Sequence, residues 1–148
     1  MTERIEKTVI IHANAETVWE HLTNPLLMQK WMGEPEMEIV IYTDWKVGNP
    51  IVISAFHHER FEDNGLVLQF QPHQIIQYSH RSSLSGLTDQ PESYTIITFF
   101  LTSDQTHTAL SISIEKFPTE TIFKHLDFYW RTTLEIIKRQ VENDVIPR

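Results

Sequence analysis

Two side chains of one predicted strand could do chemistry, the phenol of Tyr78 and the imidazole of His80. They lie in GLVLQFQPHQIIQYSH (65–80), two strand-like runs joined at residues 71–74. Because side chains alternate along a strand, Ile76, Tyr78 and His80 share one face. If that face is the inner one, both polar groups could hold the polar end of a ligand. The alternative is a structural role, in which both groups form hydrogen bonds with backbone atoms at the margin of the sheet, as most buried polar groups do.

A second stretch, His57-His58-Glu59, has residue types that bind metal ions. On a strand only His57 and Glu59 would point the same way, and two ligands are too few for a zinc site. A distant residue such as His80 would have to complete the set. We therefore predict no metal site and no cofactor.

Nucleophilic catalysis has little support in this chain. It has no cysteine, and the serines Ser82, Ser83 and Ser85 lie in SSLSGLTDQP without the glycines of a nucleophile elbow. We interpret this run as a loop that could gate the mouth of a cavity. His80 is the one inner-face candidate for acid–base catalysis, which needs a titratable group in a dry site.

Composition narrows the classes of partner. The 148 residues fit a single domain spanning residues 1–148, and 12 basic against 20 acidic residues give a net charge of −8. Nucleic acid and anionic membranes would repel such a chain. We find no signal peptide and no apolar run approaching the ~18 residues of a membrane span. With no cysteine, the chain is expected to be cytoplasmic.

The apolar pattern predicts which elements must position these side chains. A strand over 4–12 is followed by a helix that Asn14 can cap, and by a second short helix over 25–32 that begins with Pro25. From 37 to 116 the period is two, which predicts an antiparallel meander. Its turns are expected at these sites: 47–50, Asp63-Asn64-Gly65, 71–72, 86–91 and 103–105.

The C-terminal segment predicts one long helix from Thr119 to about Asn143. Its apolar residues recur at three- and four-residue spacing and form a broad stripe: Phe123, Leu126, Trp130, Leu134, Ile137 and Val141, widened by Ile122, Tyr129 and Ile136. A twisted antiparallel sheet can curl around such a helix. The sequence therefore predicts an α+β fold, a curved antiparallel sheet wrapped around a long C-terminal helix.

Four stretches together carry a family resemblance: VWEHLTNPLLMQKWM (18–32), WKVGNP (45–50), GLVLQFQPHQIIQYSH (65–80) and FPTETIFKHLDFYWRTTLEIIK (117–138). In their order and spacing the chain resembles the START-like, or SRPBCC, superfamily with the helix-grip fold of the birch-pollen allergen. More narrowly, it resembles the activator of heat-shock-protein-90 ATPase homologue family. Two positions depart from that family: Asn49 stands where a second glycine is usual, and Tyr129 adds bulk beside Trp130, which would narrow a cavity.

The resemblance implies a pocket between the inner face of the sheet and the last helix, lidded by the short helices. Superfamily members hold lipids, steroids, polyketides or plant hormones there. The residues expected to line it are Trp31, Ile53, Ala55, Tyr78, His80, Ile97, Phe99, Phe123 and Trp130, with Arg81 near the mouth. The alternative is that the aromatic members simply fill the core, as Trp19 is expected to do.

Three functions from different classes follow. The leading hypothesis is a protein that binds an apolar or aromatic small molecule in this pocket, which a solid core would exclude. The second is a co-chaperone-like interaction module with a chaperone or homodimer partner, implied by the resemblance alone. The third is a cyclase- or hydrolase-like enzyme that uses His80.

Overall fold

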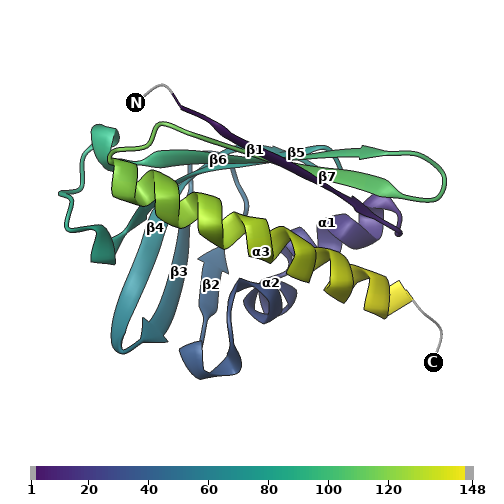
Figure 1. Ribbon diagram of the computed structural model, residues 1–148, viewed down its shortest axis with the longest axis horizontal. Helices are drawn as coiled ribbons and strands as arrows, with labels where there is room; N and C mark the ends of the chain where they lie inside the picture. The colour runs from purple at the N-terminus through teal and green to yellow at the C-terminus, as the bar shows by residue number, and fades with distance from the viewer. Residues whose placement is uncertain (1–2, 146–148) are drawn as a thin grey trace.

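The computed structural model describes residues 3–145, which form one curved sheet and one long helix with short helices between them (Figure 1). The elements in chain order are β1 (Ile5–Ile11), α1 (Ala15–Thr23), α2 (Pro25–Met32), η1 (Pro35–Met37), β2 (Val40–Thr43), β3 (Pro50–His57), β4 (Glu59–Gln71), β5 (Ile75–Ser82), η2 (Ser83–Ser85), η3 (Pro91–Ser93), β6 (Thr95–Ser103), β7 (Thr108–Glu115) and α3 (Glu120–Val145).

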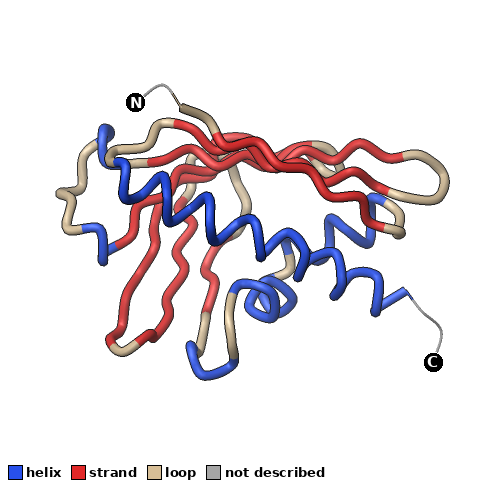
Figure 2. The backbone as a smooth tube through the Cα atoms, viewed as in Figure 1, coloured by secondary structure: helices blue, strands red, loops and turns tan. Residues whose placement is uncertain are grey.

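The seven strands pair antiparallel in the order β1-β7-β6-β5-β4-β3-β2. Figure 2 shows β1, β7, β6 and β5 as a layer along one side of α3, while β2, β3 and β4 turn away past the helix. The sheet thus curls around α3, and the predicted helix-grip fold is confirmed. None of the helices among residues 3–145 is long and apolar enough to cross a membrane.

Asparagine residues set the starts of the first two helices. Asn14 Oδ1 accepts a hydrogen bond from the Thr17 amide at 2.8 Å and caps α1. Asn24 ends α1 and caps α2, accepting from the Leu26 amide at 2.9 Å. Pro25 occupies the first turn of α2, where its missing N–H costs nothing. Both helices therefore lie where the sequence predicts them.

The predicted turn at Asp63-Asn64-Gly65 is wrong, because these residues lie inside the long strand β4. The turn between β3 and β4 is at His58, which has a left-handed backbone with φ of 64°. His57 and Glu59 pair across it. Asp63 and its neighbours are held by strands on both sides, so strand pairing outweighs the local turn preference. The departure at Asn49 is also accommodated, because Gly48 takes the left-handed position, with φ of 90°.

Gly65 of β4 lies in close contact with Ser79 of β5. A Cβ atom at this position would clash with the carbonyl group of Ser79. The Leu66 amide donates to Ser79 Oγ at 2.9 Å, and the pairing register shifts between Val67 and Gln69. This irregularity bends the sheet between its two parts, as bulges do.

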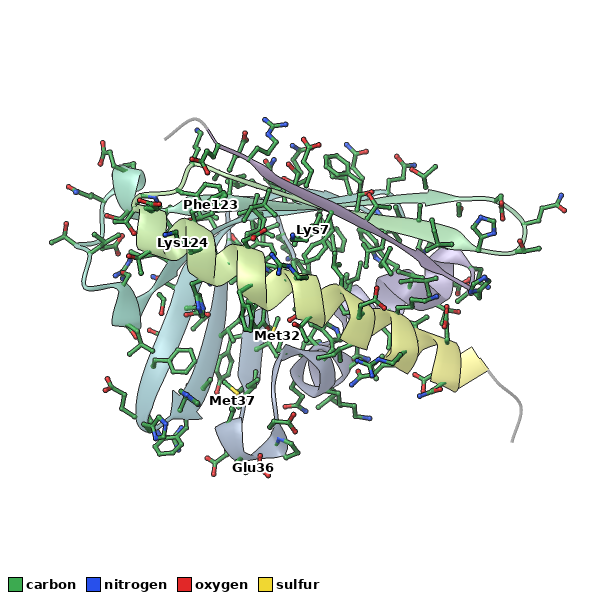
Figure 3. All side chains as sticks on the ribbon, in the orientation of Figure 1. Lys7, Met32, Glu36, Met37, Phe123 and Lys124 are labelled. Carbon is green, nitrogen blue, oxygen red and sulfur yellow. The ribbon has the colours of Figure 1, made fainter. Side chains whose placement is uncertain are left out.

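The core lies where α3 crosses β1, β7 and β6. β7 alternates as predicted, with Leu110, Ile112 and Ile114 buried against the helix. On β1 the matching inner position opposite Ile112 is Lys7, whose Nζ lies 2.9 Å from Asp127 Oδ1 of α3. Figure 3 shows Lys7 reaching toward the helix from the edge strand. This ion pair fixes α3 on the edge strand of the sheet.

Candidate functional site

The sheet register brings the polar side chains of β4 and β5 onto its inner face. His80 lies opposite Thr95 of β6, and Tyr78 lies between Ile97 of β6 and Val67 of β4. Asp63 is on the same face of β4 as Val67, because the two are four residues apart. The inner face therefore carries a carboxylate, an imidazole and a phenol on adjacent strands.

Asp63 and His80 form an ion pair that faces α3. His80 Nε2 lies 3.1 Å from Asp63 Oδ2, and the two side chains are 18% and 20% exposed. The second oxygen, Asp63 Oδ1, is buried and has no hydrogen-bond partner among the described residues. A buried carboxylate oxygen without a donor is costly. This atom is the unsatisfied acceptor of the site.

Two phenols lie near this carboxylate. Burial raises the pKa of Tyr78 well above its ordinary value, and the nearby Tyr129 and Asp63 add to the effect. Burial likewise raises the pKa of Tyr129 to about 12, with the charge of Asp63 adding to it and a hydrogen bond with Thr133 opposing it. Both phenols are therefore neutral at physiological pH. The Tyr129 hydroxyl donates its proton to the Met32 carbonyl at 2.8 Å.

Most of the predicted aromatic lining forms one packed row. Trp31 of α2 contacts Trp130 of α3, Trp130 contacts Phe99 of β6, and Phe99 contacts Tyr78, with ring centroids 6.0, 5.5 and 6.4 Å apart. All four side chains are buried. The row fills the space between α2, α3 and the middle of the sheet, and ends at Tyr78 beside the ion pair.

The other predicted lining residues separate into two groups. Ala55 and Ile97 are buried, whereas Ile53 and Phe123 are only half-buried. Phe123 packs edge-to-face on Phe117, with ring centroids 4.9 Å apart, rather than joining the aromatic row. Trp19, expected in the core, is buried and contacts Phe70.

Burial divides the space between the sheet and α3 into two ends. At the closed end the side chains are almost fully buried, and α3 packs directly on β1: Ile11, Val18, Leu110, Ile137 and Val141. At the open end several side chains that face inward remain half-buried: Ile53, Phe61, Asp63, His80 and Phe123. The inner face at the open end is thus partly accessible from outside.

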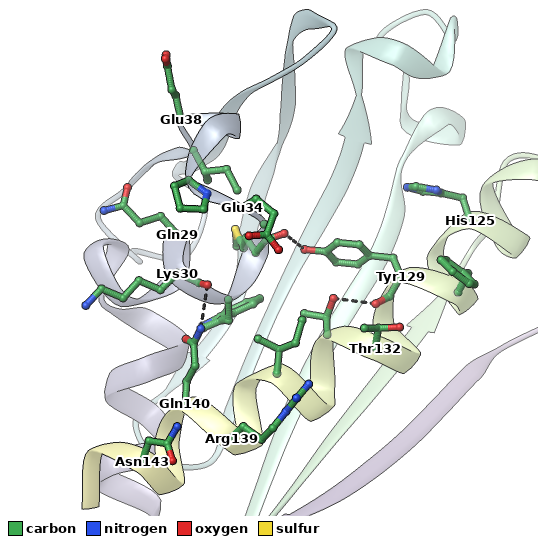
Figure 4. A pocket seen from close by; sticks show the side chains of 18 residues that line it. Gln29, Lys30, Glu34, Glu38, His125, Tyr129, Thr132, Arg139, Gln140 and Asn143 are labelled. Atoms are coloured by element: carbon green, nitrogen blue, oxygen red, sulfur yellow. Dashed lines mark hydrogen bonds between the residues drawn. The ribbon is translucent and has the colours of Figure 1, made fainter.

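A groove lies on the outside of the molecule and extends along most of α3. It runs between α2 with η1 and the outer side of α3, and has a volume of about 1180 Å³. Trp31 and Tyr129 both line it. Figure 4 shows the Tyr129 phenol spanning from α3 to the Met32 carbonyl and the Gln140 amide reaching the Lys30 carbonyl. Tyr129 therefore lies between this outer groove and the inner face.

The remaining candidates from the sequence have structural environments. His57, His58 and Glu59 are exposed at the tip of the β3–β4 hairpin, and residues 3–145 contain no cluster of three or more metal-binding side chains. The serines of the predicted loop bond to backbone: Ser82 Oγ accepts from Leu84, Ser83 Oγ from Glu62 and Ser85 Oγ from Leu87.

Arg81 points away from the ion pair. Its Nη1 donates to the Leu87 carbonyl at 3.1 Å, and its guanidinium lies over the Tyr94 ring. Arg81 therefore anchors the segment after β5 and does not join the inner-face cluster, because it neighbours His80 on the strand and faces the other side.

The sequence reasoning missed Asp63. The dipeptide Asn64-Gly65 after it is a strong turn signal, which concealed the strand. The signal that could have identified it is the alternation of side chains along a strand. Asp63 lies two residues before Gly65 and four before Val67, so it shares their face. Tyr129 was noted only for its bulk, whereas its hydroxyl also joins α3 to α2.

The curled antiparallel sheet, the long C-terminal helix and the two short helices after the first strand define the START-like, or SRPBCC, class of helix-grip proteins. A family model described as Activator of Hsp90 ATPase homolog 1-like protein matches residues 12–142, and the chain belongs to this family. No curated protein matches the sequence significantly.

Solved structures agree with this assignment. The chain is 33% identical to ChR145 from Cytophaga hutchinsonii, with a TM-score of 0.80 and 98% of each chain covered. The Aha1 dimer from Colwellia psychrerythraea is 20% identical, with a TM-score of 0.72 over 95% of this chain and 96% of the other. CalU16 from Micromonospora echinospora is 16% identical, with a TM-score of 0.69 over 99% and 78%. The latter two likenesses concern the fold.

Proposed function

We propose that the protein binds an apolar or aromatic small molecule at the open end, between the sheet and the first half of α3. The observation that carries this proposal is the buried, unpaired Asp63 Oδ1 beside two neutral phenols on an otherwise apolar face. Native proteins rarely leave such an atom unsatisfied unless a ligand or water completes it. The half-buried inner-face residues support access from outside.

In this proposal the nine residues expected from the sequence have distinct roles. Tyr78 and His80, together with Asp63, hold the polar end of the ligand. The aromatic row of Trp31, Phe99 and Trp130 forms the apolar wall behind them. The remaining aliphatic and aromatic positions contribute the sides: Ile53, Ala55, Ile97 and Phe123. The proposal also places the protein in the cytoplasm, where a chain without cysteine is well suited.

Native mass spectrometry of the freshly purified protein tests the proposal. We expect an added mass of small-molecule size that is lost on denaturation and recovered by solvent extraction. The second readout is the fluorescence of Nile red, a neutral apolar dye, which should increase on binding and decrease when the extracted molecule is added. A bare chain that also leaves Nile red fluorescence unchanged would contradict the proposal.

A second candidate function is an interaction module, and an exposed apolar surface favours it. Val40 and Tyr42 point outward from the edge strand β2, Phe56 does so from the neighbouring strand β3, and Tyr42 is 61% exposed. An exposed edge strand of this kind can pair with a partner. The family name refers to activation of an Hsp90 ATPase, and the Colwellia protein is a dimer.

Light scattering during size-exclusion chromatography tests for a homodimer, and direct binding to a purified Hsp90-type chaperone tests for that partner. We expect Tyr42→Lys to weaken either complex, while Tyr94→Lys on the loop before β6 leaves it intact. A monomer that fails to bind the chaperone would eliminate this candidate.

A further inference from the structure

The open end offers more hydrogen-bond acceptors than donors to a ligand. Asp63 Oδ2 is engaged by His80, whereas Oδ1 is buried without a donor. The Tyr129 hydroxyl already donates its hydrogen bond to the Met32 carbonyl, so its oxygen can only accept from the interior. The Tyr78 hydroxyl is a neutral group that can donate or accept. The site therefore lacks a hydrogen-bond donor, which a ligand could supply.

The charges at the open end also favour a ligand that donates a hydrogen bond over one that carries a negative charge. His80 is the basic side chain that faces Asp63, and its Nε2 is directed at the carboxylate. His80 can carry at most one positive charge, which the Asp63 carboxylate offsets, so the pair leaves no net positive charge for an acid. An anionic head group next to Asp63 would meet a like charge with little water between them. A hydroxyl or ammonium group would instead form a charge-assisted hydrogen bond to Oδ1.

We infer that the ligand ends in a hydrogen-bond donor, a hydroxyl or an amine, which binds Asp63 Oδ1, and that the carboxylic acid of the same skeleton is rejected. This inference rests on the proposed function, because it assigns the polarity of the ligand bound at that site. Asp63 is thus a specificity-determining residue.

Three matched probes test this polarity by isothermal titration calorimetry: 2-naphthol, 2-naphthylmethylamine and 2-naphthoate. They share a flat aromatic skeleton that suits the aromatic row and differ only in the head group. We expect 2-naphthol to bind at least about tenfold more tightly than 2-naphthoate, since a hydrogen bond to a charged group is worth about that much. The uncharged naphthol is the decisive probe, because an ammonium group also gains from the net charge of −8.

Asp63→Asn is the matched variant. Asparagine keeps the shape and can still accept from His80 through its amide oxygen, which places its NH2 group where Oδ1 was. The site then offers a donor, so the ratio of naphthol to naphthoate affinity should decrease at least about tenfold or invert. Glu62→Gln is the control, because the exposed Glu62 precedes Asp63 on β4, faces the opposite side and loses the same charge.

Each outcome decides a different point. If 2-naphthoate binds as tightly as 2-naphthol, or if Asp63→Asn and Glu62→Gln change the ratio equally, the inferred polarity is wrong while small-molecule binding stands. If none of the three probes binds, the proposed site itself is refuted. Circular dichroism of both variants shows that each remains folded.

Discussion

A histidine–aspartate pair occurs at both the closed and the open end of the space beneath the sheet, but the two pairs differ in their surroundings. At the closed end His21 is 4% exposed, its Nδ1 lies 2.9 Å from the Thr17 carbonyl, and its Nε2 lies 2.5 Å from Asp144 Oδ2. The other oxygen of that carboxylate is near water, since the Asp144 side chain is 49% exposed. At the open end the Asp63–His80 pair leaves a buried oxygen unpaired. The first pair links α1 to α3, whereas the second leaves one carboxylate oxygen without a donor among the described residues.

Other polar groups at the closed end also join the C-terminal part of α3 to the sheet. Lys138 Nζ donates to the Ile10 carbonyl at 2.7 Å and to Glu142 Oε2 at 2.6 Å, and the His12 amide donates to the same carboxylate at 2.9 Å. Among the described residues, no comparable hydrogen bonds to backbone atoms link the first half of α3 to β3, β4 or β5. The hydrogen bonds that stabilise the packing of α3 on the sheet are therefore concentrated at the closed end, and the open end contributes less to stability.

The strongest way to break this comparison is to truncate one isoleucine at each end. Ile11→Ala removes a fully buried side chain of β1 at the closed end and should lower the free energy of unfolding by about 3–5 kcal/mol, through lost burial and a cavity. Ile53→Ala removes a half-buried one from β3 and should cost only about 1–2 kcal/mol. Urea denaturation measures both. Equal losses would show that the two ends are packed alike.

The next effect concerns the buried histidine of the closed end. Asp144→Asn replaces the charged acceptor of His21 and should lower the free energy of unfolding by about 1–2 kcal/mol. Glu135→Gln removes one charge from an exposed position of the same helix and should change it by less than about 0.5 kcal/mol. Thermal unfolding compares the two. If both variants behave alike, Asp144 does not hold the end of α3.

Acid should weaken the closed end through Glu142. Burial alone would raise the pKa of this carboxyl, but hydrogen bonds from Lys138 and His12 outweigh it and lower the pKa to about 2. A folded-state pKa below the ordinary value of 4.5 stabilises the protein above about pH 4.5, and this stabilisation is lost as the pH falls toward 2. Solvent screening limits it to about 1 kcal/mol.

Urea denaturation between pH 6 and pH 2.5 measures this contribution. The glutamine of Glu142→Gln cannot take up a proton as the pH falls, so the free energy of unfolding of this variant should fall less over that range than that of the parent protein. Parallel curves for the two proteins would contradict a Glu142 contribution.

The smallest effect sharpens the comparison at the boundary of the open end. Tyr129→Phe removes the hydrogen bond to the Met32 carbonyl, which should cost about 1 kcal/mol and increase the association rate of Nile red. Tyr94→Phe removes a hydrogen bond to Asp89 in an exposed loop and should change neither quantity measurably. Stopped-flow fluorescence compares the rates. Unchanged Nile red kinetics in Tyr129→Phe would show that this link does not control access.

The regular elements were predictable because their patterns are long or locally determined. The alternation of β7 and the apolar stripe of α3 continue over several periods, and Asn24-Pro25 sets a helix start by itself. The polar part of the site was less accessible. Tyr78 and His80 were identified by parity, but Asp63 was not, because its turn-like neighbours are overridden by strands paired on both sides.

Packing between elements was also beyond the sequence. Phe123, expected at the pocket, also packs on Phe117 just before α3, a contact that no local pattern predicts. Whether Trp31, Phe99 and Trp130 line a pocket or fill the core depends on the distance between α3 and the sheet, which no local pattern records. They form a continuous row.

Gly65 has a consequence for how such a protein can diverge. Because a side chain there would clash with the Ser79 carbonyl, β4 can lie this close to β5 only with glycine at this position. The close packing of the two strands thus depends on the backbone at Gly65, whereas the polarity of the inner face depends on Asp63 and His80. Under the proposed function, mutations near Gly65 would change the shape of the site and mutations at Asp63 or His80 its head-group preference, so descendants of this chain could inherit the two properties separately.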